Sequence, residues 1–271
     1  MREAGDFHEE VEALAALLDG AGHRALSLPT QFKGWTVEEV IGHLHMFDVG
    51  ARFSIEDHRD GGDRFARFMV PVAEALAGRG TMMDAQRVWL GEIALGGPAL
   101  VEVWRDGALD LSRRYAELDP KARLAWAGPD MSARSSVTAR QMETWAHGHE
   151  VFDVLGVVRE EGERLRNIAH LGWVTRGWTF QVRQMAVPEP EPYVRLVSPA
   201  GAIWEWGDAT SPERIEGPAL GFCQTVTQTR AFADTDVTAS GPGATAWMQN
   251  AQCFAGPPVD PPAPGSRHRA T

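Results

Sequence analysis

Three residues in two distant stretches of the sequence have the types and spacing of metal ligands. Glu143 and His147 are four residues apart, so a helix would place both side chains on one face. His43, from a second helix, could complete a set of three ligands. Such a set leaves coordination positions open, which a catalytic metal requires and a structural metal does not. The residues therefore indicate metal-dependent chemistry without indicating a substrate.

The ligand types narrow the choice of metal and point to neighbouring residues. Imidazole and carboxylate groups suit Zn²⁺, Ni²⁺ or Fe²⁺, and zinc is the default where no redox chemistry is implied. Arg140 and Glu150 lie about one turn on either side of the glutamate–histidine pair, so we consider them candidates for orienting the ligands or the substrate. Met46 and Phe47, one turn after His43, would supply an apolar wall.

The same residues also have a simpler interpretation. Glutamate and histidine are often four residues apart by chance, and a histidine on an apolar helix face is more often a core residue than a ligand. The motif HExxH is absent, so the chain is not a zincin. Trp35, Trp145, Trp173 and Trp178 could surround a ligand cavity, although helix packing is the more common role of tryptophan. Spacing alone leaves these alternatives open.

The candidate ligands lie in predicted helices. Thr36, which two glutamates follow closely, can cap a helix that carries His43. Another helix begins between Ser135 and Thr138 and ends near Leu155. Long amphipathic segments occupy most of residues 1–186, so we expect a helical bundle there, in which side chains from facing helices converge.

The composition changes in a segment rich in proline and glutamate at 187–192, which we predict to be a domain boundary. Beyond it, strands are expected at 193–197, 202–206 and 236–240, and helices at 218–231 and 242–254. The fold class is therefore predicted as α+β, with a helical bundle at 1–186 and a small α+β domain at 193–256. The remainder, 257–271, is rich in Pro, Gly, Ser and Arg and is expected to be disordered.

The overall composition excludes some classes of partner. The 271 residues carry a net charge of −11, which argues against binding nucleic acid or an anionic membrane. The sequence shows no secretory signal and no apolar run of membrane-spanning length, so we expect a cytoplasmic protein, monomeric or homodimeric, that acts on a small molecule. Cys223 and Cys253 belong to no metal motif and are expected to be isolated thiols.

Several stretches resemble one protein family. The sequence WTVEEVIGHL at 35–44 resembles the second-helix motif of the DinB-like, mycothiol-dependent maleylpyruvate isomerase superfamily. The sequence ETWAHG at 143–148 resembles its later-helix motif. The stretches 217–223, 234–236 and 251–258 resemble the second domain of a subgroup of these proteins. The resemblance covers nearly the whole chain to about residue 258.

The resemblance implies a DinB-like, up-and-down four-helix bundle that holds a divalent metal through His43, Glu143 and His147, and an α+β domain that closes one side of the pocket. Relatives bind a low-molecular-weight thiol (mycothiol, bacillithiol or glutathione) as a thiolate on the metal. The family often has aspartate three residues after the second histidine ligand, where this chain has Glu150. The bias of basic residues toward arginine hints at a GC-rich genome, which favours mycothiol.

Three functional hypotheses follow. The first is a metal- and thiol-dependent transferase or isomerase acting on a small electrophile. The second is a thiol-independent metalloenzyme, such as a hydrolase, lyase or cyclase, in which metal-bound water or a coordinated substrate reacts. The third is a non-catalytic protein that binds an apolar ligand. The resemblance favours the first hypothesis, although function depends on the pocket rather than on the fold.

Overall fold

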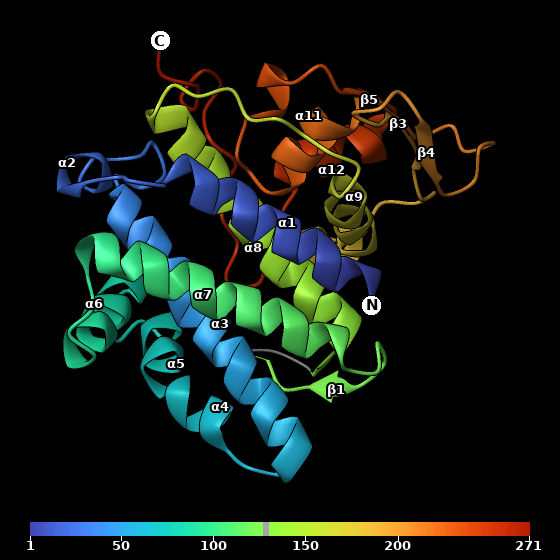
Figure 1. Ribbon diagram of the computed structural model, residues 1–271. Helices are drawn as coiled ribbons and strands as arrows, with labels where there is room; N and C mark the ends of the chain where they lie inside the picture. The colour runs from blue at the N-terminus through green and yellow to red at the C-terminus, as the bar shows by residue number, and fades with distance from the viewer. Residues whose placement is uncertain (127–129) are drawn as a thin grey trace. The chain divides into compact units, whose positions relative to one another are not determined.

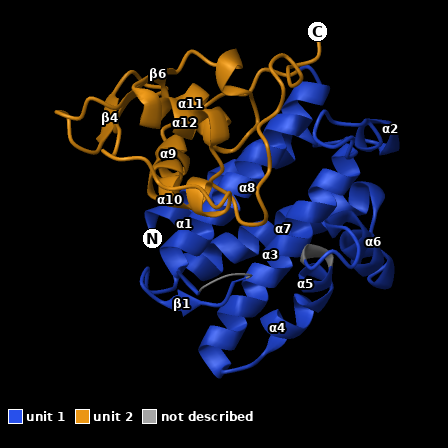
Figure 2. Ribbon diagram, turned by 180° about the vertical axis from the view of Figure 1, so that it is seen from behind, with its two compact units in different colours: residues 1–156 blue, residues 157–271 orange. Residues whose placement is uncertain are grey.

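The computed structural model describes residues 1–126 and 130–271, which form two compact units, Met1–Gly156 and Val157–Thr271 (Figure 2). The fold is α+β, as predicted, because the helical first unit precedes a second unit that contains a sheet. Within the described ranges, none of the helices combines the length with the apolar composition that a membrane span requires.

The first unit is built mainly from helices (Figure 1). They are α1 (Arg2–Leu17), α2 (His23–Leu26), α3 (Val37–Asp60), α4 (Arg64–Phe68), α5 (Val70–Leu76), α6 (Met82–Glu92), α7 (Gly97–Ala116) and α8 (Ala133–Val154). The four long helices form the predicted bundle, in which both α1 and α3 pack against α7 and α8. A short antiparallel pair, β1 (Arg123–Leu124) and β2 (Met131–Ser132), precedes α8.

An apolar core holds the four long helices together. Residues without exposed surface come from every one of them, among them Phe7 and Leu14 of α1, Ile41 and Leu44 of α3, Trp104 of α7 and Val137 of α8. Burial of one such side chain contributes roughly 1.5–3 kcal/mol. The bundle therefore gives α3 and α8 fixed relative positions, and these two helices carry the three candidate ligands.

Capping groups define where the two ligand-bearing helices begin. The Thr36 hydroxyl accepts a hydrogen bond from the Glu39 amide at 3.2 Å, and the Glu39 carboxylate accepts one from the Thr36 amide at 2.9 Å. This reciprocal capping box confirms the predicted start of α3. Helix α8 starts earlier than the sequence suggested, because Ser132 caps it by accepting a hydrogen bond from the Ser135 amide at 3.1 Å.

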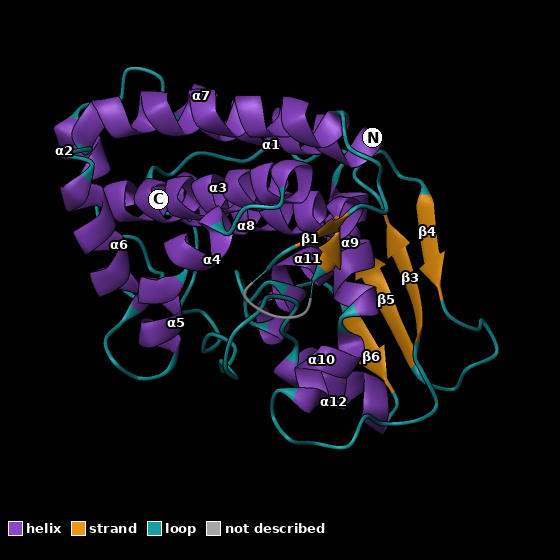
Figure 3. Cartoon of the chain, turned by 90° about the horizontal axis from the view of Figure 1, so that it is seen from below, coloured by secondary structure: helices purple, strands orange, loops and turns teal. Residues whose placement is uncertain are grey.

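The second unit combines a four-stranded sheet with short helices (Figure 3). Its elements are α9 (Leu165–Val174), α10 (Arg176–Gln181), β3 (Tyr193–Val197), β4 (Ile203–Trp206), β5 (Arg214–Pro218), α11 (Ala219–Val226), the 3₁₀ turn η1 (Phe232–Asp234), β6 (Thr238–Ser240) and α12 (Pro242–Asn250). The strand order is β4-β3-β5-β6, with β3 parallel to β5 and the other pairs antiparallel.

The division between the units differs from the predicted boundary at residue 186. Helices α9 and α10 belong to the second unit, which begins at Val157. Helix α9 packs closely on α11, so closely that a side-chain carbon added at Gly172 would lie 2.8 Å from Val226 Cγ2. The proline-rich segment therefore connects two parts of one compact unit.

Residues 257–271 were expected to be disordered. In the structure they belong to the second unit, and hydrogen bonds attach them to other parts of that unit. The buried amides of Gln228 and Gln252 donate to the carbonyls of Val259 and Pro257 at 2.8 and 3.0 Å. The Gly265 amide donates to Asp234 at 2.8 Å. Composition alone missed this because the partners are side chains elsewhere in the unit.

Candidate metal centre

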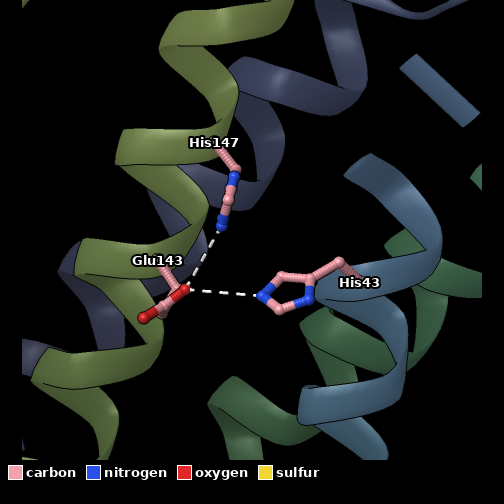
Figure 4. Close-up of side chains that lie close together, drawn as sticks. All are labelled: His43, Glu143 and His147. Carbon is pink, nitrogen blue, oxygen red and sulfur yellow. Dashed lines mark ion pairs between the residues drawn. The ribbon is translucent and has the colours of Figure 1, made fainter. Parts of the chain in front are cut away.

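His43, Glu143 and His147 converge on one point between α3 and α8 (Figure 4). The Glu143 Oε2 atom lies 3.7 Å from His43 Nε2 and 3.5 Å from His147 Nε2. The three ligand atoms all lie within 4.8 Å of one another. Among residues 1–126 and 130–271, no other group of three or more His, Cys, Asp or Glu side chains is arranged to hold a metal ion.

These distances suit a common metal ion. Zinc binds imidazole nitrogen at about 2.0–2.1 Å and carboxylate oxygen at about 2.0–2.2 Å, so two donors of one ion lie roughly 3–4 Å apart. Both separations from Glu143 to a histidine nitrogen fall in that range, and the full set of three atoms spans up to 4.8 Å. We call these three residues the triad.

The protonation states of the triad also suit a cation. Burial lowers the pKa of His43 from 6.5 to about 4, so its imidazole is neutral at neutral pH. Burial would raise the pKa of Glu143, but its interactions with His147 and His43 outweigh burial and hold that pKa well below its usual range. The triad therefore contains an ionised carboxylate beside a neutral imidazole, which are the forms that coordinate metals.

Aromatic rings surround the two histidines. The Trp35 ring lies 5.3 Å from the His43 ring and stacks on the His147 ring at 6.0 Å. The Phe47 ring lies 4.8 Å from His43, and the Phe32 ring lies 5.0 Å from His147. Phe32, Trp35 and Phe47, which we call the aromatic wall, thus present apolar surface to the triad.

The structure separates the other predicted aromatic and apolar residues from the triad's immediate contacts. Met46 is buried in a cluster with Phe65, Met69 and Val72 instead of forming part of the wall. Trp145 is fully buried, with its ring 4.4 Å from that of His149. The two tryptophans from the second unit pack within that unit: Trp173 lies near Trp247, and Trp178 donates a hydrogen bond to the carbonyl of Phe254.

A buried ion pair connects the two helices that carry the triad. Arg140 Nε donates to Asp48 Oδ1 at 2.8 Å, and Arg140 Nη2 donates to the carbonyl of Leu44 at 3.3 Å. The exposed fractions of Arg140 and Asp48 are 1% and 3%. Burial raises the pKa of Asp48 above its usual value, even though the Arg140 charge lowers it. Arg140, predicted as an orienting residue, therefore contacts α3 beside His43.

Two further residues extend or flank this arrangement. The Tyr115 hydroxyl on α7 lies 2.6 Å from the Ser136 hydroxyl on α8, and burial raises the pKa of Tyr115 to about 12. Glu150, the second predicted orienting residue, is buried on α8 one turn beyond His147. It is not one of the residues whose ligand atoms lie within 4.8 Å of one another.

Comparison with known proteins places this arrangement in a family. The family model described as the mycothiol maleylpyruvate isomerase N-terminal domain matches residues 7–152, more than half of the chain. The chain belongs to this family. The matched residues of the mycothiol maleylpyruvate isomerase N-terminal domain extend from α1 to α8 and include the whole triad.

Relatives of this family member extend the likeness beyond the matched domain. Two uncharacterised proteins from strains of Mycobacterium tuberculosis are each 40% identical over 254 residues, which cover 93% of this chain and 95% of theirs. Crystal structures of the mycothiol-dependent maleylpyruvate isomerase, one of them a histidine-to-alanine mutant, share the fold at TM-scores of 0.53 and 0.57. They are 16% and 15% identical, and the match covers 88% of this chain and 92% of theirs.

Sequence reasoning missed two contributors to this family domain. Phe32 reaches the triad because the chain folds back before α3, where the Thr30 amide donates to the Trp35 carbonyl at 2.7 Å. The glycine at Gly34, with a positive φ of 70°, signals such a turn. Asp48 carried a weaker signal, because a carboxylate in an apolar helix face needs a buried partner.

Proposed function

We propose that this protein is a divalent-metal-dependent enzyme that activates a low-molecular-weight thiol, mycothiol. The activated thiol is either transferred to a small electrophilic substrate or used to isomerise that substrate. The convergence of His43, Glu143 and His147 carries the proposal, since it arises within a mycothiol maleylpyruvate isomerase N-terminal domain. Zinc suits the donor set, and nickel or iron is also compatible with it.

The triad residues would supply three ligands and leave further positions for the thiol. A bound divalent cation lowers the pKa of a coordinated thiol and so provides a thiolate at neutral pH. Glu143 supplies negative charge, because its carboxylate stays ionised, and His43 supplies a neutral imidazole at Nε2. The aromatic wall limits access of water to the histidine rings.

Arg140 acts as a positioning residue in this proposal. Its guanidinium is paired with Asp48 and with the Leu44 carbonyl, so it is committed to holding α8 against α3. Glu150 remains a candidate orienting group through its place one turn beyond His147.

Metal analysis of the purified protein beside Glu143→Ala tests the ligand set. We expect stoichiometric metal in the wild type and a loss of at least ~100-fold in affinity in the variant, because one of three protein ligands is removed. Glu102→Ala, on an exposed position of α7, is the matched control and should keep its metal. Unchanged metal content in Glu143→Ala would refute the triad as the ligand set.

Titration of the cobalt-substituted protein with mycothiol tests the thiol. Coordination of a thiolate should add a sulfur-to-metal charge-transfer band and alter the visible spectrum of the cobalt. If the spectrum and the turnover of candidate electrophiles are both unchanged by mycothiol, the thiol-dependent mechanism is wrong. Turnover that persists without any thiol would instead favour the thiol-independent metalloenzyme, in which metal-bound water or a coordinated substrate reacts.

A further inference from the structure

An apolar pocket lies within the first unit, beside the aromatic wall. Its volume is about 300 Å³. Phe65, Met69 and Val72 form its buried part, whereas Ala66 and Ala73 are exposed at its rim. Ala125 and Trp126 complete the lining, so every side chain that lines the pocket is apolar.

The pocket is held against α3, the helix that carries His43. The Ser54 hydroxyl, which is buried on α3, donates a hydrogen bond to the Ala125 carbonyl at 2.9 Å. The Trp126 ring stacks on the Phe65 ring at 6.4 Å and so forms one side of the pocket. The position of the pocket relative to α3 is therefore fixed by a partly buried hydrogen bond and by ring packing.

A chain of ring contacts connects the pocket to the triad. The Trp126 ring lies 6.4 Å from the Phe47 ring, and the Phe47 ring lies 4.8 Å from the His43 ring. The Phe47 ring thus lies near both His43 and the Trp126 wall of the pocket. A molecule that reacts beside His43 could place an extended apolar group in the pocket.

The size and chemistry of the pocket define its occupant. An apolar cavity of about 150 Å³ is enough to bind benzene, so this volume suits a bicyclic aromatic group or an alkyl chain. The pocket offers no cationic side chain that could pair with a carboxylate. Arg140, which lies near the triad in the first unit, is already paired with Asp48 rather than with a substrate carboxylate.

We propose that this pocket binds the apolar group of the substrate, so that the electrophile carries an aryl or alkyl substituent. The proposal deepens the proposed function and rests on it for the reaction. In the addition, the thiol sulfur bonds to the electrophilic carbon of a conjugated alkene while the C=C π bond breaks. The thiol proton ends on the carbon next to the carbonyl, so the atoms and electrons balance.

Binding of the uncharged fluorophore phenylnaphthylamine tests the pocket without any reaction. Ala66→Leu and Ala73→Leu narrow the rim at exposed helical positions, where the exchange costs little helix propensity. We expect each to weaken binding about tenfold or more, because the added methyl groups occupy the space of the probe. Ala116→Leu makes the same exchange at an exposed position of α7 and should bind like the wild type. Equal affinity in all four proteins would overturn the proposal.

Turnover of a series of alkyl vinyl ketones with mycothiol tests the occupant. In the wild type, kcat/KM should rise by up to about fourfold for each added methylene until the pocket is full. In Ala73→Leu this increase should stop at shorter chains, whereas Ala116→Leu should follow the wild type. No dependence on chain length in the wild type would overturn the proposal.

The two tests also separate this proposal from the proposed function. His43→Ala should leave probe binding unchanged, because His43 does not line the pocket. If the wild type shows rim-dependent probe binding, but mycothiol neither supports turnover of any ketone nor changes the spectrum of the cobalt-substituted protein, the proposed function fails. In that case the pocket binds apolar molecules, but the proposal that it binds an apolar group of the substrate is wrong.

Discussion

The two polar clusters between α3 and α8 differ in how far their charges are satisfied inside the protein. In the triad, the side chains of Glu143 and His147 keep 24% and 12% of their surface exposed, and the ligand atoms face a shared space. In the second cluster, Arg140 and Asp48 are 1% and 3% exposed, and each bonds to the other. One cluster is suited to receive a ligand, and the other is closed.

The difference shows how one pair of helices can carry both an open cluster, suited to bind a ligand, and a closed cluster that holds the helices together. Arg140 lies one turn before Glu143 on α8, and it also contacts the Leu44 carbonyl, next to His43 on α3. The closed cluster thus fixes the spacing of the two helices at the level of the open one. The contacts of Arg140 thus help to position the side chains of the triad within the protein.

The largest effect should follow from breaking the closed cluster. Arg140→Met leaves the Asp48 carboxylate buried without its partner and should lower the free energy of unfolding by about 3–5 kcal/mol. Arg140→Met combined with Asp48→Leu removes both charges and should recover most of that loss. Urea unfolding of the wild type, the single variant and the double variant measures both values. A double variant no more stable than the single one would show that the pair is not an isolated electrostatic unit.

Acid should weaken the open cluster, because His43 is buried in its neutral form. The folded pKa of His43 is about 4, below its ordinary 6.5, so the unfolded chain binds more protons between these two values. His43 therefore stabilises the protein fully above pH 6.5, and about 3 kcal/mol of that stability is lost as the pH falls to about 4. Arg140 stays charged throughout this range.

Unfolding of the chelator-treated protein between pH 7 and pH 4 measures this loss. In His43→Gln the loss on acidification should be smaller than in the wild type by about 3 kcal/mol. His45→Gln is the matched comparison, because burial and the charge of Arg52 also lower the pKa of His45 to about 4. Both variants should reduce the acid response, but only His43→Gln should also impair metal binding. Equal acid responses in all three proteins would contradict buried, neutral histidines.

The open cluster was predictable from the sequence, and the closed one was not. The spacing of Glu143 and His147 depends only on helix periodicity, and Thr36 shows where the helix of His43 begins. The pairing of Arg140 with Asp48 depends instead on which helices face each other and at what height. Periodicity within one helix does not contain that information.

The same limit explains why parts of the second unit were not predicted from the sequence. Strand β5 (Arg214–Pro218) was missed because Ile215 is its one buried residue and no apolar alternation surrounds it. Helix α9 was assigned to the bundle because an amphipathic helix does not reveal its partner, which proved to be α11. Local signals thus predicted helices and caps, whereas strand pairing and unit boundaries required contacts between distant residues.

The smallest effect should come from the Tyr115–Ser136 pair, which connects α7 to α8. Tyr115→Phe removes the hydroxyl that lies 2.6 Å from the Ser136 hydroxyl and should lower the free energy of unfolding by about 1 kcal/mol. Because burial raises the pKa of Tyr115 to about 12, the phenol is neutral at working pH, so the loss should not vary between pH 6 and pH 9. Ser136→Ala and the double variant complete a cycle whose coupling energy should account for most of the loss.

Metal affinity distinguishes a contribution to stability, as expected for Tyr115, from a contribution to the candidate metal site. Tyr115 and Ser136 connect α7 to α8 but are not among the triad's contacts, so Tyr115→Phe should bind metal as tightly as the wild type. Arg140→Met, in contrast, should weaken metal binding as well as stability, because Arg140 joins the two ligand-bearing helices directly. Equal loss of metal affinity in both variants would mean that the bundle as a whole, rather than the Arg140–Asp48 pair, positions the triad.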